Sequence, residues 1–188
     1  SFGKAVMPGY RFDKAKVILS IDSDFLTNVT YHSDFSKRRN LTGKSSAVNT
    51  FIAAETHPSM TGSNADQRIP LRPGDQRKFA LVLAKALSEL GVGGSVGVSG
   101  IDIDKTASEL GISKDVILRS AKALASAKGE SLVIASGSNT ETEDAIDLQI
   151  AVNMLNSMLG NDGKTIDATN ALKEGKKTSI SIAQVKEV

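Results

Sequence analysis

The chain has 188 residues, with 23 Lys and Arg against 21 Asp and Glu, and it contains no cysteine. This length suits one large domain that can bury a core without cross-links. The missing cysteine excludes disulfides, a cysteine nucleophile, and thiolate ligands for metals or iron–sulfur clusters within this chain. The net charge of +2 is close to balance, so bulk charge indicates neither a nucleic-acid binder nor an anionic membrane surface as partner.

The sequence lacks both kinds of membrane signal. No apolar run approaches the roughly 20 residues that a transmembrane helix needs. The chain begins at Ser1, and its first residues contain no apolar signal core. We therefore expect a segment of a longer protein, with no direct membrane span and no targeting signal in this segment.

Three apolar, β-branched runs predict strands, at residues 15–22, 50–55 and 131–136. They are apolar throughout rather than alternating, which is typical of parallel strands covered on both faces. Between and after them, residues 75–90 and 142–159 predict helices that end at Gly91 and Gly160.

This alternation of strand, loop and helix predicts an α/β fold. We expect a mostly parallel, Rossmann-like sheet with helices on both faces, in which the three strands are neighbours. Residues 1–188 are interpreted as one domain with a glycine-rich linker at 91–100 and a small helical insert at 101–128. Residues 36–49 are interpreted as a basic, polar connection.

The insert also suggests a helix-turn-helix, because helices at 105–110 and 114–124 meet at a turn where Ser113 can cap the second helix. Binding to DNA would use three cations of the second helix, Lys114, Arg119 and Lys122. These point in several directions, and Asp104, Glu109 and Asp115 would face the same DNA backbone. We therefore expect no nucleic-acid binding, with a DNA-binding protein kept as a second alternative.

Polar residues follow all three predicted strands. Asp22 and Asp24 follow the first, Glu55 and His57 the second, and residues 136–139 the third. Since the carboxyl ends of parallel strands are where α/β sheets bind ligands, these residues mark the candidate site.

The motifs that resemble a known family begin with residues 51–87, "FIAAETHPSMTGSNADQRIPLRPGDQRKFALVLAKAL". This run resembles the molybdopterin oxidoreductases, in which an acidic strand end precedes a Thr-x-x-x-Ala-Asp element and an Arg-Pro-Gly loop that opens a helix. "SLVIASGSN" and "LNSMLGNDGKT" resemble the next unit. With "FDKAKVILSIDSDFL" and "YHSDFSKRR", the sequence is most similar to the large iron–sulfur and molybdopterin-like subunit of bacterial alternative complex III, over most of residues 8–170.

The resemblance implies a cradle for molybdopterin guanine dinucleotide, with no catalytic residue and no metal ligand in this segment. Arg72 would offer a fork of donors to phosphate, and amide groups after Gly74 would meet a phosphate or guanine. The implied cofactor-binding residues are Asp22, Glu55, His57, Asp66, Arg72, Gly74, Ser136, Gly137 and Asn139.

One departure favours a scaffold without its own cofactor. Family members that bind the cofactor have Pro-Gly-Thr-Asp where this chain has Pro73-Gly74-Asp75-Gln76, which adds a negative group beside the expected phosphate. Replacing Asp75-Gln76 by Thr-Asp is therefore predicted to move the loop toward binding. The alternatives stay open: a genuine cofactor-binding oxidoreductase domain, or a loop in which Asp66 merely pairs with Arg68.

The resemblance also implies partners and a cellular location for the chain. The partners would be other subunits or domains of a membrane-bound, quinol-oxidising respiratory complex on the periplasmic face of a bacterial membrane. Iron–sulfur clusters would lie elsewhere in the parent chain. His32 is interpreted as a hydrogen-bonded loop residue, and Lys37, Arg38 and Arg39 as either a solvated loop or a docking patch for an acidic partner.

Overall fold

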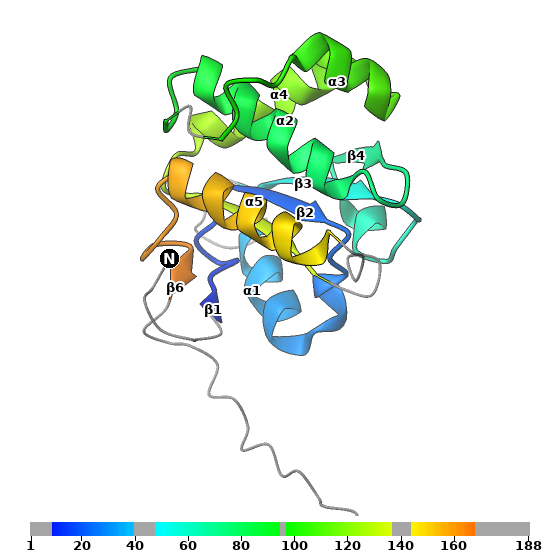
Figure 1. Cartoon of the computed structure of the whole chain (residues 1–188). Coiled ribbons are helices and arrows are strands. Elements are labelled where there is room, and N and C mark those ends of the chain that lie inside the picture. The colour runs from blue at the N-terminus through cyan, green and yellow to red at the C-terminus, as the bar shows by residue number, and fades with distance from the viewer. Residues whose placement is uncertain (1–8, 40–47, 95–96, 137–143, 168–188) are drawn as a thin grey trace, which may run out of the picture.

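The computed structural model describes residues 9–39, 48–94, 97–136 and 144–167. A parallel sheet of order β4-β3-β2-β5 lies at its centre (Figure 1). Its strands are β2 Val17–Ile21, β3 Thr50–Glu55, β4 Gln67–Pro70 and β5 Ser131–Ala135. The three predicted strands are confirmed as parallel neighbours, because β2 pairs with β3 on one side and with β5 on the other.

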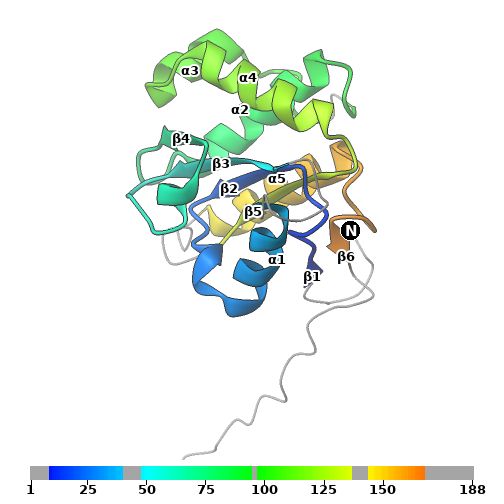
Figure 2. The same cartoon turned by 180° about the vertical axis from the view of Figure 1, so that it is seen from behind.

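Helices cover both faces of the sheet, as predicted. They are α1 Val29–Arg39, α2 Gln76–Glu89, α3 Ile103–Leu110, α4 Lys114–Ser126 and α5 Ala145–Met158. Helices α2, α4 and α5 pack on one face and α1 lies on the other, which the two opposite views show (Figures 1 and 2). Two short 3-10 helices are η1 Phe25–Thr27 and η2 Gly62–Asn64.

The alternating side chains of β2 explain the two layers. Val17, Leu19 and Ile21 join the core under α2 and α5, whereas Ile18 joins a smaller cluster under α1. That smaller cluster is rich in phenylalanine, and the rings of Phe12, Phe25, Phe35 and Phe51 contact one another. Both faces of β2 are buried, so the strand has no exposed face, as its nearly unbroken apolar sequence predicted for a central parallel strand.

The free edge of β5 is closed by side chains of α5 and the segment after it. The Asn156 amide bonds both the N–H and the C=O of Val133, at 3.0 and 2.7 Å, as a neighbouring strand would. Asn161 donates to Asn156 at 2.8 Å and accepts from Ser131. A two-stranded antiparallel pair, β1 Gly9–Tyr10 with β6 Ile166–Asp167, lies nearby.

Two predictions about local structure were wrong. Residues 36–39 are not a connection, and His32 is not in a loop, because both belong to helix α1. The helix was missed since only Phe35 in it is fully buried, which leaves almost no apolar periodicity. The polar run after β3 also contains a strand, β4, at the edge of the sheet, where Pro70 is tolerated.

The helical hairpin of α3 and α4 follows its sequence signals. Asp102 and Ser113 accept hydrogen bonds from backbone N–H groups at the starts of the two helices. Gly111 ends α3 in the left-handed conformation at φ 69°. Lys114 is paired with Asp104 across the hairpin at 2.7 Å, and the hairpin packs on α2.

Candidate functional site at the carboxyl ends of the strands

Asp22 lies at the end of β2 in a left-handed conformation, φ 48°, which few residues other than glycine adopt. Its side chain is buried among donors. One carboxylate oxygen accepts from Thr56 N at 2.8 Å and from Thr56 Oγ1 at 3.1 Å, and the other accepts from Gln76 Nε2 at 2.9 Å. Asp22 therefore ties the end of β2 to the end of β3 and to the start of α2.

Glu55, at the end of β3, is also buried and also bound. Arg68 of β4 donates to one oxygen at 2.5 Å, and Ser59 donates to the other at 2.7 Å. The carboxylate fills the space above Gly62, where a Cβ atom would overlap it. Glu55 is thus enclosed by its own loop, and its acceptor sites are directed at protein donors.

His57, Arg72 and Gly74 form the exposed rim of this site. The His57 ring contacts Thr56 Oγ1 at 2.8 Å, next to the Asp22 network. Arg72 is about two-thirds exposed and donates to the backbone C=O of Glu109 at 3.1 Å, so its fork turns toward α3. Gly74 has φ 90° with open space around it, and it turns the chain into α2.

Asp66 does not belong to this group. It precedes β4, and its carboxylate accepts from Phe51 N at 2.7 Å and from Arg39 Nη2 at 2.5 Å, near the beginning of β3. The suggestion that Asp66 pairs with Arg68 was wrong: Asp66 pairs with Arg39, and Arg68 with Glu55. Residues two apart in a strand lie on one side of the backbone, but the Asp66 side chain turns back to cap β3.

Ser136 follows β5 and faces β2, where its hydroxyl lies 2.6 Å from the Ser23 hydroxyl. The helices that follow β2 and β5 lie on opposite faces of the sheet, α1 after β2 and α5 after β5. A crevice of about 320 Å³ opens at this point, walled by Tyr10, Tyr31 and Phe25. Gly137 and Asn139, the two other predicted residues of this loop, lie outside the described residues.

The crevice walls carry two phenols whose pKa is perturbed. Burial raises the pKa of Tyr10, with Tyr31 adding to the effect, and burial raises that of Tyr31. Their rings meet edge to face at 6.0 Å between centroids. Both side chains are therefore neutral hydrogen-bonding groups at pH 7, and they line the crevice together with the Asp24 carboxylate rather than with a cation.

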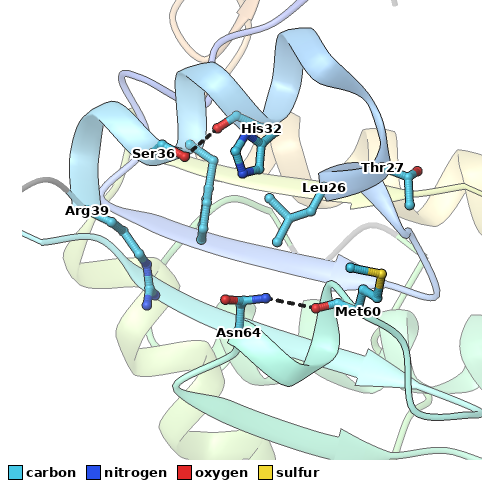
Figure 3. Close-up of a pocket in the computed structure, with 8 residues that line it drawn as sticks. Leu26, Thr27, His32, Ser36, Arg39, Met60 and Asn64 are labelled. Atoms are coloured by element: carbon cyan, nitrogen blue, oxygen red, sulfur yellow. Dashed lines mark hydrogen bonds between the residues drawn. The ribbon is translucent and has the colours of Figure 1, made fainter.

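A larger hollow of about 540 Å³ lies between α1 and the η2 loop (Figure 3). Leu26, Phe35 and Met60 give it an apolar lining. Its guanidinium, Arg39, already binds Asp66 and Asn49 and lies 5.0 Å from the Phe35 ring centre. The hollow thus combines an apolar surface with a cation that the protein itself has engaged.

Three residues of the hydrogen-bond network at the strand ends were not predicted from the sequence. They are Thr56, Ser59 and Gln76, whose donors satisfy the two buried carboxylates. A usable signal was present: Gln76 opens a helix that is otherwise apolar on its inner face, and a polar residue there needs a buried partner. The sequence does not show which carboxylate it reaches.

The described residues, 9–39, 48–94, 97–136 and 144–167, contain no group of three or more His, Asp or Glu placed to hold a metal ion. Within the same ranges, no helix combines the length and apolar character required to cross a bilayer. At the strand ends, the buried carboxylates of Asp22 and Glu55 accept hydrogen bonds from neighbouring residues of the chain.

No family model matches the sequence, and no curated protein matches it. Among solved structures, the chain is similar to acetylene hydratase from Pelobacter acetylenicus, with a TM-score of 0.68 and 17% sequence identity. The match covers 87% of this chain and 24% of that one, so the chain spans about a quarter of the length of its structural neighbour. At this identity the likeness establishes a shared fold, the α/β fold with a parallel sheet described above.

Proposed function

We propose that this chain is a molybdopterin-oxidoreductase-like α/β domain that acts as a scaffold in a quinol-oxidising respiratory complex and holds no cofactor of its own. Two facts support the family. The motifs at 51–87 resemble molybdopterin oxidoreductases, and the fold is shared with acetylene hydratase. The respiratory setting rests on the sequence resemblance.

The observation that carries the scaffold role is that both strand-end carboxylates are buried and bound by protein donors. Asp22 accepts three hydrogen bonds from Thr56 and Gln76, and Glu55 is closed off by Arg68 and Ser59. A ligand that used these oxygens would have to displace protein donors from buried groups, at a cost of about 1–3 kcal/mol for each group left unpaired.

Charge at the rim supports the same role. Asp75 has no capping bond to α2 and lies 3.9 Å from Arg72, so it partly neutralises the cation nearest to where a phosphate would bind. An uncompensated carboxylate within several ångströms disfavours a dinucleotide by on the order of 1 kcal/mol or more. The site is therefore adapted to internal hydrogen bonds rather than to an anionic ligand.

The buried position of Gln76 makes the predicted Thr-Asp replacement a poor test of the loop. Gln76 is buried and donates to Asp22, so the Thr-Asp replacement predicted from the sequence would place two carboxylates against each other. Asp75→Thr alone removes the rim charge and keeps that bond. Calorimetric titration of GDP should give no saturable binding with the wild type, and only weak binding with Asp75→Thr.

A genuine cofactor-binding domain is the second candidate, favoured by the crevice between β2 and β5, since such switch points bind ligands in α/β folds. Tight GDP binding by the wild type, lost in Arg72→Ala, would establish it and reject the scaffold role. Pterin and metal analysis of the full-length parent gives an independent readout. A bound pterin in stoichiometric amount, lost when this domain carries Arg72→Ala, would also reject it.

A further inference from the structure

The beginning of the sheet, opposite the candidate site, carries a cluster of cations. Helix α1 ends here, and the turns that precede β2, β5 and β6 also lie at this end. The cluster, called here the basic end, consists of Lys14, Lys16, Arg38, Lys128 and Lys164. All of these except Arg38 are exposed.

Lys16 and Glu130 lie at the centre of the basic end. Lys16 N donates to the backbone C=O of Glu130 at 2.6 Å, and their side chains form an ion pair at 2.5 Å. Both side chains are about half exposed. Arg38 is fixed on one side of this pair, because it donates to the backbone C=O groups of Asp13 and Lys14, at 2.8 and 3.2 Å.

Lys164 also lies near the pair, next to Glu130. Its Nζ atom is 2.5 Å from the position that a Cβ atom at Gly129 would take, so the ammonium rests on the backbone next to Glu130. Gly129 has φ 79° and donates to the backbone C=O of Leu159, which fixes the turn that presents Lys128. Cations from three separate segments thus surround one carboxylate.

Within the part of the chain that the structure describes, the carboxylates near the basic end do not balance these cations. The Lys16 hydrogen bond lowers the pKa of Glu130, with Arg38 and Lys164 adding to the positive field. Arg11 donates two hydrogen bonds to the Asp13 carboxylate, which is therefore paired with a cation outside the cluster. Even with the exposed Asp162 included, the basic end keeps an excess of positive charge.

We infer that the basic end is a docking surface for an acidic segment of another protein chain. A protein segment can place single carboxylates between the cations and compete with Glu130 for Lys16. Duplex DNA would need a stripe of protein cations that follows the DNA phosphates, and the Glu130 carboxylate would face those phosphates. The inference rests on the charges of this surface and does not depend on the proposed function.

Glu130 then acts as a built-in competitor that tunes affinity. It occupies the central ammonium when no partner is bound, and it must give way when a partner's carboxylate arrives. Neutralising Glu130 should therefore tighten binding, whereas reversing the flanking cations should weaken it. A surface without a binding role would show no such opposite pair of effects.

The test uses the 188-residue chain and a fluorescent hexaglutamate peptide, followed by fluorescence anisotropy at two salt concentrations. The wild type should bind, and salt should weaken the binding. Lys128→Glu with Lys164→Glu should weaken it about tenfold or more, and Glu130→Gln should tighten it several-fold. Circular dichroism checks that each variant is folded.

Lys105→Glu with Lys122→Glu is the matched control, because it changes net charge equally and lies on the exposed surface of the α3–α4 hairpin. This variant should weaken binding less than about threefold. Equal losses in the two double variants would overturn the inference, as would no binding by the wild type. Tighter, Lys164-dependent binding of a DNA duplex or of phosphatidylglycerol vesicles would assign the surface to phosphates instead.

Discussion

At the carboxyl end of the sheet, Asp22 and Glu55 are buried and bonded to protein donors, whereas at the other end Lys128 and Lys164 are exposed beside a single central carboxylate. Burial makes an unpaired charge costly, so the first group had to be satisfied within the chain. Exposed ammonium groups remain hydrated and can exchange water for a partner. Sequence motifs pointed to the carboxyl end of the sheet as the binding site. The exposed cations make the basic end the more available for binding.

The largest expected effect tests the carboxyl end. Gln76→Asp would set a second carboxylate against Asp22 in a buried place and should lower the free energy of unfolding at pH 7 by about 3 kcal/mol or more. Urea unfolding measures it. Gln76→Asn is the control, since it shortens the side chain but adds no charge, and should cost less.

The stability of the Gln76→Asp variant should also depend on pH. Two facing carboxylates raise the pKa of one of them in the folded state, so the folded protein binds more protons than the unfolded one. The deficit of Gln76→Asp should therefore shrink as the pH falls from 7 to about 4.5. A deficit that stays constant with pH, or equal stability of the two variants, would refute the role given to Asp22.

An intermediate effect is expected at Gly62. Gly62→Ala pushes a methyl group into the space of the Glu55 carboxylate and must displace it from Arg68 or Ser59. The free energy of unfolding should fall by about 2 kcal/mol. Gly100→Ala is the control, because open space surrounds Gly100, and it should be close to neutral.

Combining Gly62→Ala with Glu55→Ala sharpens this test. If the loss arises from the clash with the carboxylate, the double variant should be more stable than the sum of the two single losses predicts. Additive losses, measured by urea unfolding, would mean that Gly62 serves some purpose other than making room for Glu55.

The smallest effect concerns Asp13, whose pKa is lowered chiefly by its hydrogen bonds from Arg11. A lowered pKa contributes stability above the unfolded pKa, about 4, which is lost as the pH falls through the folded value. Asp13→Asn should therefore cost less than about 1 kcal/mol at pH 7 and nothing near pH 2. A cost that does not change with pH would show that Asp13 acts through shape rather than charge.

The sequence alone predicts the α/β class, the three buried strands and helices at 75–90 and 142–159, because unbroken apolar runs and helical apolar stripes report burial directly. It also predicts the cap of α4, since Ser113 acts on its nearest neighbours. Only the tertiary structure decided what the polar residues do. Helix α1 is held by Phe35 and by contacts distant in sequence, which leave no periodic signal.

The polar loop after β3 shows the limit most clearly. The sequence placed Asp22, Glu55 and Arg72 at one end of the sheet, but Asp66 returns to the beginning of β3, where it binds Arg39 across 27 residues of chain. The partners of Asp22 and Glu55 likewise come from Gln76 and Arg68, which lie 54 and 13 residues away. Charge pairing depends on distances in space, and only the packing of the loop, β4 and α2 against the strand ends sets those distances.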